Sequence, residues 1–412
     1  MLDLVVRRAR ISGVGPGSVD LGIEDGRVVA VAPRIDVACP ELDARDRLVL
    51  PGLVDTHLHL DKSRTADRCV QTEGTLAEAI RETARIKATF TEEDVYQRAR
   101  ATLEACVVQG TTRVRSQVEV DPAVGLRGLD AVQRLAGDLA WAVDVQVCVF
   151  AQEGLTDSGA TDALLVEALE RGVPVVGGAP YADVDPAGQL DRVFELARCF
   201  DVDVDLHLDL AETTEAMQLA DVCKRTVAHG WEGRVTVGHV TQLSLLPPEE
   251  YGALCDLVAD SGVAVTVLPA TDLFLMGRAT DTAKPRGVVS LGPLLGLGAA
   301  CSVATNNVLN AFTPYGDGSL IRMANLYANV CHAGSRAQLQ ECLDLVTTSA
   351  ARVMRIPDYA IQLGAPADLV CVDATDGADA IARVAPVFWG LKHGRRTFTR
   401  ELPVLHRPGA NT

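Results

Sequence analysis

The segment PGLVDTHLHLDKS, residues 51–63, carries two histidines, His57 and His59, separated by one residue. Alternate residues of a strand point to the same side. One face of this segment would therefore carry Asp55, His57, His59 and Asp61, and the other face would carry valine, threonine and leucine. Burying a row of ionisable groups is costly without a partner, and a divalent metal ion is an efficient one. Taken alone, the segment fits a pair of hydrogen-bonded core histidines equally well.

Seven more strand-like runs follow, at residues 111–120, 143–151, 173–178, 202–208, 234–239, 263–268 and 300–305. Helix-like segments lie between them, for example at 74–88, 92–109, 161–171, 188–199 and 212–229. Eight strands alternating with helices predict an α/β fold, a (β/α)8 TIM-type barrel. Short strands also precede the barrel and return at 364–399. We expect a barrel over residues 51–354 and a small, discontinuous β-domain built from residues 1–50 and 355–412.

Composition narrows the functional classes. The chain has 412 residues, 48% of them hydrophobic and 23% charged, as in ordinary globular proteins. A net charge of -17 and an aromatic content of 4% argue against a nucleic-acid partner, which needs clustered cations and stacking surfaces. The 11 cysteines form no Cys-x-x-Cys pair, so reduced thiols and a cytoplasmic location are expected. No apolar stretch is long enough to cross a bilayer, so we expect no membrane partner.

Polar residues recur where the predicted barrel strands end, and barrel active sites lie at those C-terminal ends. The set comprises His57, His59, Gln152, His207, Asp209, His239, Asn306 and Asn307. Imidazole is a common ligand for zinc, iron, cobalt and manganese. Chance convergence of four unrelated core histidines on one barrel mouth explains this pattern less well than a metal site does. The pattern therefore predicts a metal site.

Several motifs resemble those of the amidohydrolase superfamily, and within it the cytosine deaminases. PGLVDTHLHLDKS and GAPADLVCVDA are typical of the superfamily, whereas FAQEG and NNVLNAFTPYG point to the cytosine deaminase branch. The resemblance implies a (β/α)8 barrel with a small β-sandwich formed by both ends of the chain. It also implies one divalent metal ion and a water that attacks a ring carbon bearing an amine or amide.

The resemblance also implies roles for individual residues. The metal ligands would be His57, His59 and His207, and His239 would contact the reacting water. Gln152 would read the polar edge of a heterocycle, and Phe312 would form an aromatic wall. Asn307, at the end of the eighth strand, joins them as a candidate substrate-binding residue.

Two positions depart from the family pattern. Leu210 stands where the family has a proton-carrying glutamate, and Asn306 stands where it has an aspartate. An amide can coordinate a metal or accept a hydrogen bond, but it cannot act as a general base. Losing general acid–base catalysis typically costs about 10²–10⁴-fold in rate. Asp209, Asp61 or Glu212 could replace the missing acid, or could instead orient the histidines.

Two functional hypotheses follow. The first is a metal-dependent hydrolase that cleaves a C–N bond of a small nitrogen heterocycle or cyclic amide, with zinc or iron favoured over manganese or cobalt. The second is a weakly catalytic or non-catalytic relative that binds a small polar heterocycle. The retained histidines favour the first, because a pure binding protein has no use for four of them. Either protein would take a small-molecule partner, and a homo-oligomer is compatible with both.

Overall fold

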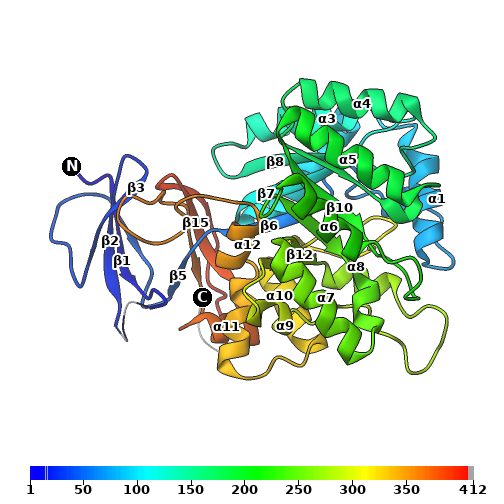
Figure 1. Ribbon diagram of the computed structural model, residues 1–412. Coiled ribbons are helices and arrows are strands. Elements are labelled where there is room, and N and C mark those ends of the chain that lie inside the picture. The colour runs from blue at the N-terminus through cyan, green and yellow to red at the C-terminus, as the bar shows by residue number, and fades with distance from the viewer. Residues whose placement is uncertain (14, 16, 407–412) are drawn as a thin grey trace.

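A computed structural model describes residues 1–13, 15 and 17–406, and its larger part is the predicted barrel (Figure 1). Eight parallel strands follow one another in chain order from β6 to β13. A parallel bridge between Leu58 and Asn306 joins the first strand to the end of the last. The strands are β6 (Leu53–Leu58), β7 (Thr111–Glu119), β8 (Asp144–Ala151), β9 (Val175–Gly178), β10 (Asp203–Leu208), β11 (Val235–His239), β12 (Ala264–Val267) and β13 (Cys301–Val303). All eight predicted strands are confirmed.

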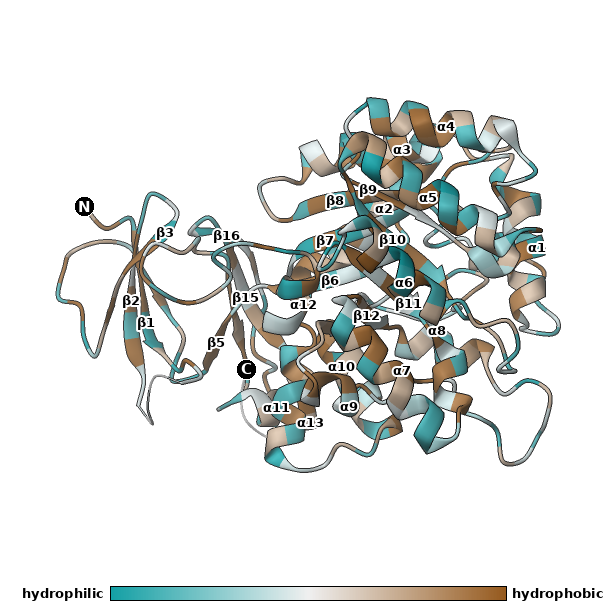
Figure 2. Cartoon of the chain, in the orientation of Figure 1, coloured by the Kyte–Doolittle hydropathy of each residue, from teal (hydrophilic) through white to brown (hydrophobic). Residues whose placement is uncertain are grey.

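Helices surround these strands. Within and after the barrel they are α1 (Leu76–Lys87), α2 (Glu92–Val108), α3 (Arg127–Asp138), α4 (Gly159–Glu170), α5 (Pro186–Phe200), α6 (Leu219–His229), α7 (Pro248–Ser261), α8 (Pro269–Leu275), α9 (Gly292–Gly296), α10 (Leu320–Val330), α11 (Arg336–Asp344) and α12 (Thr348–Val353). Short 3₁₀ turns are η1 (Ala66–Arg68), η2 (Pro180–Ala182) and η3 (Thr241–Leu245). The outer helices carry hydrophilic residues beside hydrophobic ones (Figure 2), as expected for helices that cover a core on one face only.

The two ends of the chain form a small β-domain beside the barrel, on the side where β6 begins (Figure 1). One sheet has the order β3-β2-β1-β4 and the other the order β16-β15-β14-β5. Their strands are β1 (Leu4–Ala9), β2 (Val19–Glu24), β3 (Arg27–Ala32), β4 (Glu41–Asp43), β5 (Leu48–Pro51), β14 (Leu369–Val372), β15 (Val387–Lys392) and β16 (Arg395–Thr399). The domain boundaries at 50/51 and 354/355 stay predictions, and residues 407–412 lie outside the described residues.

Two details differ from the sequence-based expectation. The helix expected over 212–229 begins only at Leu219, because the Asp209 carboxylate accepts hydrogen bonds from the backbone N–H groups of Gln218 and Leu219 and fixes the helix start there. The strand-rich run at 364–399 also contains one helix, α13 (Gly377–Ala382), which Asp376 caps. Neither change moves a strand of the barrel.

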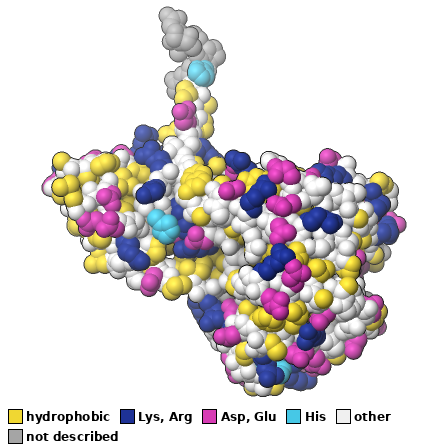
Figure 3. Space-filling view, turned by 90° about the horizontal axis from the view of Figure 1, so that it is seen from above, with side chains coloured by type: hydrophobic (Ala, Val, Ile, Leu, Met, Phe, Trp, Pro, Cys, Tyr) yellow, Lys and Arg dark blue, Asp and Glu magenta, His cyan; other side chains and the backbone are white. Residues whose placement is uncertain are grey.

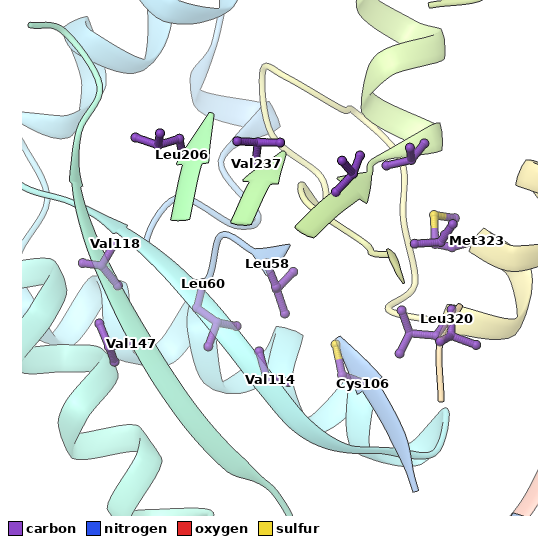
Figure 4. Close-up of a cluster of buried hydrophobic side chains, with 14 of the residues drawn as sticks. Leu58, Leu60, Cys106, Val114, Val118, Val147, Leu206, Val237, Leu320 and Met323 are labelled. Carbon is purple, nitrogen blue, oxygen red and sulfur yellow. The ribbon is translucent and has the colours of Figure 1, made fainter. Parts of the chain in front are cut away.

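Alternation along the strands separates the core from the candidate site. Leu58, Leu206 and Val237 are fully buried members of the main apolar cluster, shown in Figure 4. The residues next to them along the strands, His57 and His207 among them, point to the opposite face. Truncating a leucine in such a core typically costs about 2–5 kcal/mol, so this packing holds the strands that carry the histidines.

Acidic and basic side chains are interspersed over the face of the molecule shown in Figure 3. That face therefore presents no single extended basic patch. Among the described residues, none of the helices has the length and apolar character needed to cross a membrane.

Candidate active site

Three histidine side chains meet at the C-terminal end of the barrel. His57 and His59 come from β6 and the residue after it, and His207 comes from β10. The Nε2 atom of His207 lies 3.1 Å from Nε2 of His57 and 3.0 Å from Nε2 of His59. All three residues are buried. The barrel thus gathers three imidazole nitrogens from residues that lie up to 150 positions apart in the chain.

These imidazoles are neutral, and their N–H groups are too few to make hydrogen bonds of both Nε2–Nε2 contacts. Burial lowers the pKa of His57, and lowers the pKa of His59 and His207 well below the usual value. A neutral imidazole has one N–H, so Nε2 of His207 can donate to only one of its two neighbours. A divalent cation would satisfy all three lone pairs, and ligands at about 2.0–2.1 Å from one ion lie no more than about 4 Å apart. The three residues therefore fit a metal ion.

Neighbouring groups orient these rings. Asp205 Oδ1 lies 3.7 Å from Nδ1 of His57, and its other oxygen accepts a hydrogen bond of 2.8 Å from Nη1 of Arg115. A carboxylate behind a ligating histidine fixes the ring and raises its basicity. Gly238 leaves room for the same ring, because a Cβ there would lie 3.2 Å from Cε1 of His57. Phe150 stacks on His207 with ring centroids 4.5 Å apart.

His239, the fourth histidine of the set, forms a separate couple. Its Nδ1 lies 2.6 Å from Oδ1 of Asp272, and both residues are buried. Its ring centroid lies 5.7 Å from that of His207 and 6.1 Å from that of His57. A histidine with an acidic partner behind it, next to a candidate metal site, is suited to accept and return a proton.

Backbone strain accompanies these side chains. Asp209, His239, Val240 and Asn306 all have positive φ angles, between 46° and 71°. Non-glycine residues rarely adopt this conformation, and such residues cluster at functional sites. Each of the four lies at the end of a barrel strand or within three residues after it, so the barrel mouth holds several of the positive-φ residues of the described chain.

The candidate substrate-binding residues surround this mouth. Gln152 is 4% exposed, and its Nε2 has no hydrogen-bond partner among the described residues. Asn307 lines a cavity of about 470 Å³. Phe312 is buried, and its ring centroid lies 5.4 Å from Nζ of Lys62. Gln152 thus keeps an amide N–H available for a ligand.

Asn306 is placed by its backbone. Its N–H donates to the carbonyl of His57 at 2.8 Å, and its carbonyl accepts from the N–H of His59 at 2.8 Å. Both polar atoms of its side chain are buried, with no hydrogen-bond partner among the described residues. An unpartnered buried amide is costly, and an ion or ligand beside the histidines would relieve that cost.

The three acids that could substitute for the missing glutamate all accept hydrogen bonds from backbone N–H groups. Both Asp209 oxygens accept backbone hydrogen bonds at the start of α6, and burial raises the pKa of its carboxyl to about 6. Asp61 accepts from the N–H groups of Lys62 and Glu119 at 2.8 and 2.9 Å. Glu212 accepts from a backbone N–H at 2.7 Å. These bonds give each acid a structural role, and the proton-carrying role stays a prediction.

The amidohydrolase family model matches residues 68–398. The chain belongs to the amidohydrolase family.

Three relatives show its place in that family. A structure of 5-methylcytosine deaminase from Klebsiella pneumoniae liganded with 5-fluorocytosine is 28% identical, with a TM-score of 0.93, and the match covers 98% of this chain and 100% of that one. N-isopropylammelide isopropyl amidohydrolase from Pseudomonas sp. (strain ADP) is 28% identical over 95% of this chain and 96% of its own. Pterin deaminase from Rhizobium rhizogenes is 27% identical over 95% and 90%. This amidohydrolase therefore lies in the cytosine deaminase-like branch.

Leu210 marks the clearest difference within this amidohydrolase site. The side chain is 3% exposed and belongs to an apolar cluster with Leu275, Met276 and Phe312. A leucine in this setting offers neither a proton nor a hydrogen bond to a substrate. The position therefore presents apolar surface where the family resemblance leads one to expect an acid.

Sequence reasoning missed several residues of the site. Lys62 is buried, with Nζ 2.9 Å from Oε2 of Glu119 and 5.2 Å from the ring centroid of Phe150. Gln117 on β7 has both side-chain amide atoms buried without a partner among the described residues. Lys62 directly follows the histidine motif in the sequence, and this position could have indicated that it belongs to the site. Asp272 carried no such signal, because its partner His239 is 33 residues earlier.

Proposed function

We propose that this chain is a metal-dependent hydrolase that cleaves a C–N bond of a small nitrogen heterocycle or cyclic amide, by deamination or by amide or amine hydrolysis with metal-activated water. The observation that carries the proposal is the group of three buried, neutral imidazoles, His57, His59 and His207, whose Nε2 atoms approach to 3.0–3.1 Å beside His239. The named relatives are two deaminases and an amidohydrolase, which supports the same reaction class.

The three histidines would hold one divalent ion, with zinc or iron favoured by the all-imidazole donor set. When bound, the ion would supply Lewis acidity that lowers the pKa of a water from 15.7 toward about 7. The amide of Asn306 would lie next to this centre as a neutral oxygen or N–H partner. It cannot serve as a base there, because an amide takes up no proton near neutral pH.

Proton transfer falls to His239. The carboxylate of Asp272 accepts a hydrogen bond from Nδ1 of His239, which leaves the lone pair on Nε2. Nε2 would take a proton as water attacks and return it to the departing nitrogen. Asp272 would stabilise the imidazolium between these two steps. Asp209 stays a candidate for a second proton carrier, although both of its oxygens are engaged with α6.

Substrate contacts would come from the polar side chains at the mouth. Gln152 would pair its free N–H with an acceptor on the ring. Asn307 and Phe312 would complete the polar and aromatic parts of the wall. Such a site reads a flat, polar heterocycle.

A panel of heterocycles tests this function. Metal-loaded protein would be incubated with amino-, chloro- and alkylamino-substituted pyrimidines, triazines and cyclic ureas, and amine or chloride release would be followed. We expect amine release from at least one compound, and a loss of about 10²–10⁴-fold in His239→Ala. His229, a half-buried histidine on the last turn of α6 that stacks on Phe194, provides the control His229→Ala.

A second candidate is a binding protein with little or no turnover, favoured by one observation. Leu210 is buried in an apolar cluster, where it can supply no proton. Binding of heterocycles by calorimetry, without release of any amine from the whole panel by folded, metal-loaded protein, would favour this candidate over the hydrolase.

A further inference from the structure

The cavity of about 470 Å³ is lined by the neighbouring helices α8 and α10 and by the loop that follows β13. Leu273 and Phe274 come from α8, Met323 and Leu326 from α10, and Tyr315 from the loop. Small-molecule sites usually measure about 300–1,000 Å³ and have apolar walls with a few polar groups. This cavity therefore has the size and the wall of a small-molecule site.

The cavity borders the candidate active site without containing its histidines. Among the described residues that line it, none is a histidine. Phe274 of α8 lines the cavity, whereas Asp272 of the same helix bonds to His239. Asn307 lines it too, and its neighbour Asn306 is bonded through its backbone to two of the histidines. The cavity therefore shares two structural elements with the reaction centre, α8 and the segment after β13.

Three cationic side chains line this cavity, those of Arg278, Lys284 and Arg322, and none of the described residues that line it is acidic. Arg322 pairs with Asp317 at 3.0 Å. Among the described residues, no carboxylate pairs with the guanidinium of Arg278 or the ammonium of Lys284. The whole chain carries 55 Asp and Glu against 38 Lys and Arg, so this local excess of cations runs against its overall charge. A hollow lined by one sign of charge attracts ligands of the opposite sign.

Two of the polar side chains keep hydrogen-bond donors available. The guanidinium of Arg278 lies 4.4 Å from the centroid of Phe274 and donates to the carbonyl of that residue, which uses one of its five N–H groups. Asn307 is 4% exposed, and its Oδ1 accepts from Nδ2 of Asn310 at 2.6 Å. The NH2 group of Asn307 donates to no acceptor among the described residues. A buried donor without an acceptor is costly, and an anionic oxygen in the cavity would relieve that cost.

The apolar part of the wall sets a second requirement on the ligand. The rings of Phe274 and Tyr315 meet edge to face with centroids 5.6 Å apart, and Met276 and Met323 line the same space. Such side chains gain by covering apolar ligand surface. An inorganic anion would leave this wall uncovered, so the cavity favours an anion with an apolar body.

We propose that this cavity binds a small organic anion. Its carboxylate or phosphate would face Arg278, Lys284 and Arg322, and its apolar body would lie against Phe274 and Tyr315. The binding does not depend on the proposed hydrolase function. An anion of this chemistry has two sources, a separate molecule or the acidic arm of a heterocycle that also reaches the histidines.

Calorimetry on the metal-loaded full chain tests the site with benzoate, phenyl phosphate and benzamide, which is the neutral counterpart of benzoate. We expect a Kd below about 1 mM for both anions, which is ordinary for ligands of about ten atoms. Benzamide should bind at least about tenfold more weakly, because it loses the charge-assisted hydrogen bonds. Added salt should weaken the binding of the anions, because it screens the cations at the cavity edge.

Charge-removing variants place the anion in this cavity. Arg322→Gln and Lys284→Gln should each raise the Kd of benzoate by about three- to tenfold, because each removes one partly exposed cation. Arg171→Gln and Lys224→Gln are the matched controls. Arg171 ends α4 and pairs with Asp130, and Lys224 lies on α6 and pairs with an aspartate of that helix. The controls should leave the Kd unchanged, and thermal unfolding would confirm that every variant is folded.

Three results would overturn the site. They are Kd values above about 10 mM for both anions, equal Kd values for benzoate and benzamide, and benzoate binding that neither Arg322→Gln nor Lys284→Gln weakens. The last of these would place the anion elsewhere on the protein, for instance at a bound metal ion.

Two further titrations identify the source of the anion. Benzoate would be titrated into protein saturated with cytosine or with 5-carboxycytosine. Displacement of benzoate by 5-carboxycytosine alone would assign the anion to the acidic arm of a heterocycle, and undisturbed benzoate binding in both titrations would assign it to a separate molecule. Displacement by cytosine as well would place benzoate among the histidines and overturn the site.

Discussion

Replacing Asp272 by asparagine tests the proton-transfer couple most sharply. In the wild type, Asp272 Oδ1 lies 2.6 Å from Nδ1 of His239, and its Oδ2 accepts from the backbone N–H of Leu268 at 3.1 Å. An asparagine can keep the bond to Leu268 through its carbonyl. Its NH2 group would then face Nδ1 and donate to it, which forces the histidine proton onto Nε2 and removes the lone pair that must accept the proton.

The size of the effect follows from the charge that is lost. A carboxylate and an imidazolium with charge centres about 4 Å apart attract by about 4 kcal/mol at an effective dielectric constant of 20. That energy corresponds to about 10³-fold in rate, within the range of about 10²–10⁴ usual for general acid–base groups. We therefore expect kcat to fall about 10³-fold in Asp272→Asn, with KM changed far less.

The assay is steady-state amine release by metal-loaded protein, with metal content and thermal unfolding measured for each variant. Asp130, an exposed aspartate that pairs with Arg171, provides the control Asp130→Asn. Partial recovery of Asp272→Ala by added formate would indicate that the missing negative charge, and not a misfolded loop, limits the rate. A kcat within about threefold of the wild type in correctly folded, metal-loaded Asp272→Asn would refute the reasoning.

Other positions give further predictions. Gln152→Ala should lower kcat/KM by about 10–100-fold at unchanged stability, because a lost buried hydrogen bond costs about 1–3 kcal/mol, and unchanged kinetics on the true substrate would remove it from the site. The double variant Asn306→Asp, Leu210→Glu should increase ammonia release from cytosine or isocytosine by more than the product of the two single changes. Leu210→Glu alone should destabilise the fold by about a few kcal/mol, because it buries a carboxylate without a partner. Deamination of cytosine by the wild type at ordinary enzyme rates would contradict this account. Burial alone would raise the pKa of Glu119, but Lys62 and Lys87 lower it from 4.5 to about 2. The ionised Glu119 therefore contributes up to about 3 kcal/mol to the free energy of unfolding above pH 4.5, and this contribution is lost as the pH falls toward 2. The free energy of unfolding of Glu119→Gln, measured in urea, should fall below the wild type at pH 7 and approach it near pH 3, and a gap independent of pH would exclude this linkage.

Much of the fold could be predicted because the strands carry strong local patterns. In VDVDLHLDL, residues 202–210, apolar and polar residues alternate strictly, and β10 spans Asp203–Leu208. The same alternation put His57 and His207 on the inner face. Parallel strands with helices between them leave few topologies, so the convergence of the strand ends followed from the fold class.

The rest depended on contacts between distant residues. The helix after β10 starts at Leu219 because Asp209 turns back to cap it, and no periodicity reveals such a turn. The pairing of His239 with Asp272 depends on how the fold places α8 relative to β11, and no sequence pattern indicates that placement. A cavity of about 610 Å³ with a largely apolar wall is built from α1, the loop after β10 and the end of α8, which no local sequence pattern connects.

The central claim is that His57, His59 and His207 hold a divalent ion on which C–N hydrolysis depends. The most direct measurement is elemental analysis of protein purified without chelators, for the wild type, His207→Ala and the control His229→Ala, with amine release measured on the same samples. The account predicts about one ion per chain in the wild type and the control, and little metal and little activity in folded His207→Ala. A wild-type protein that is free of metal, folded and fully active would contradict it.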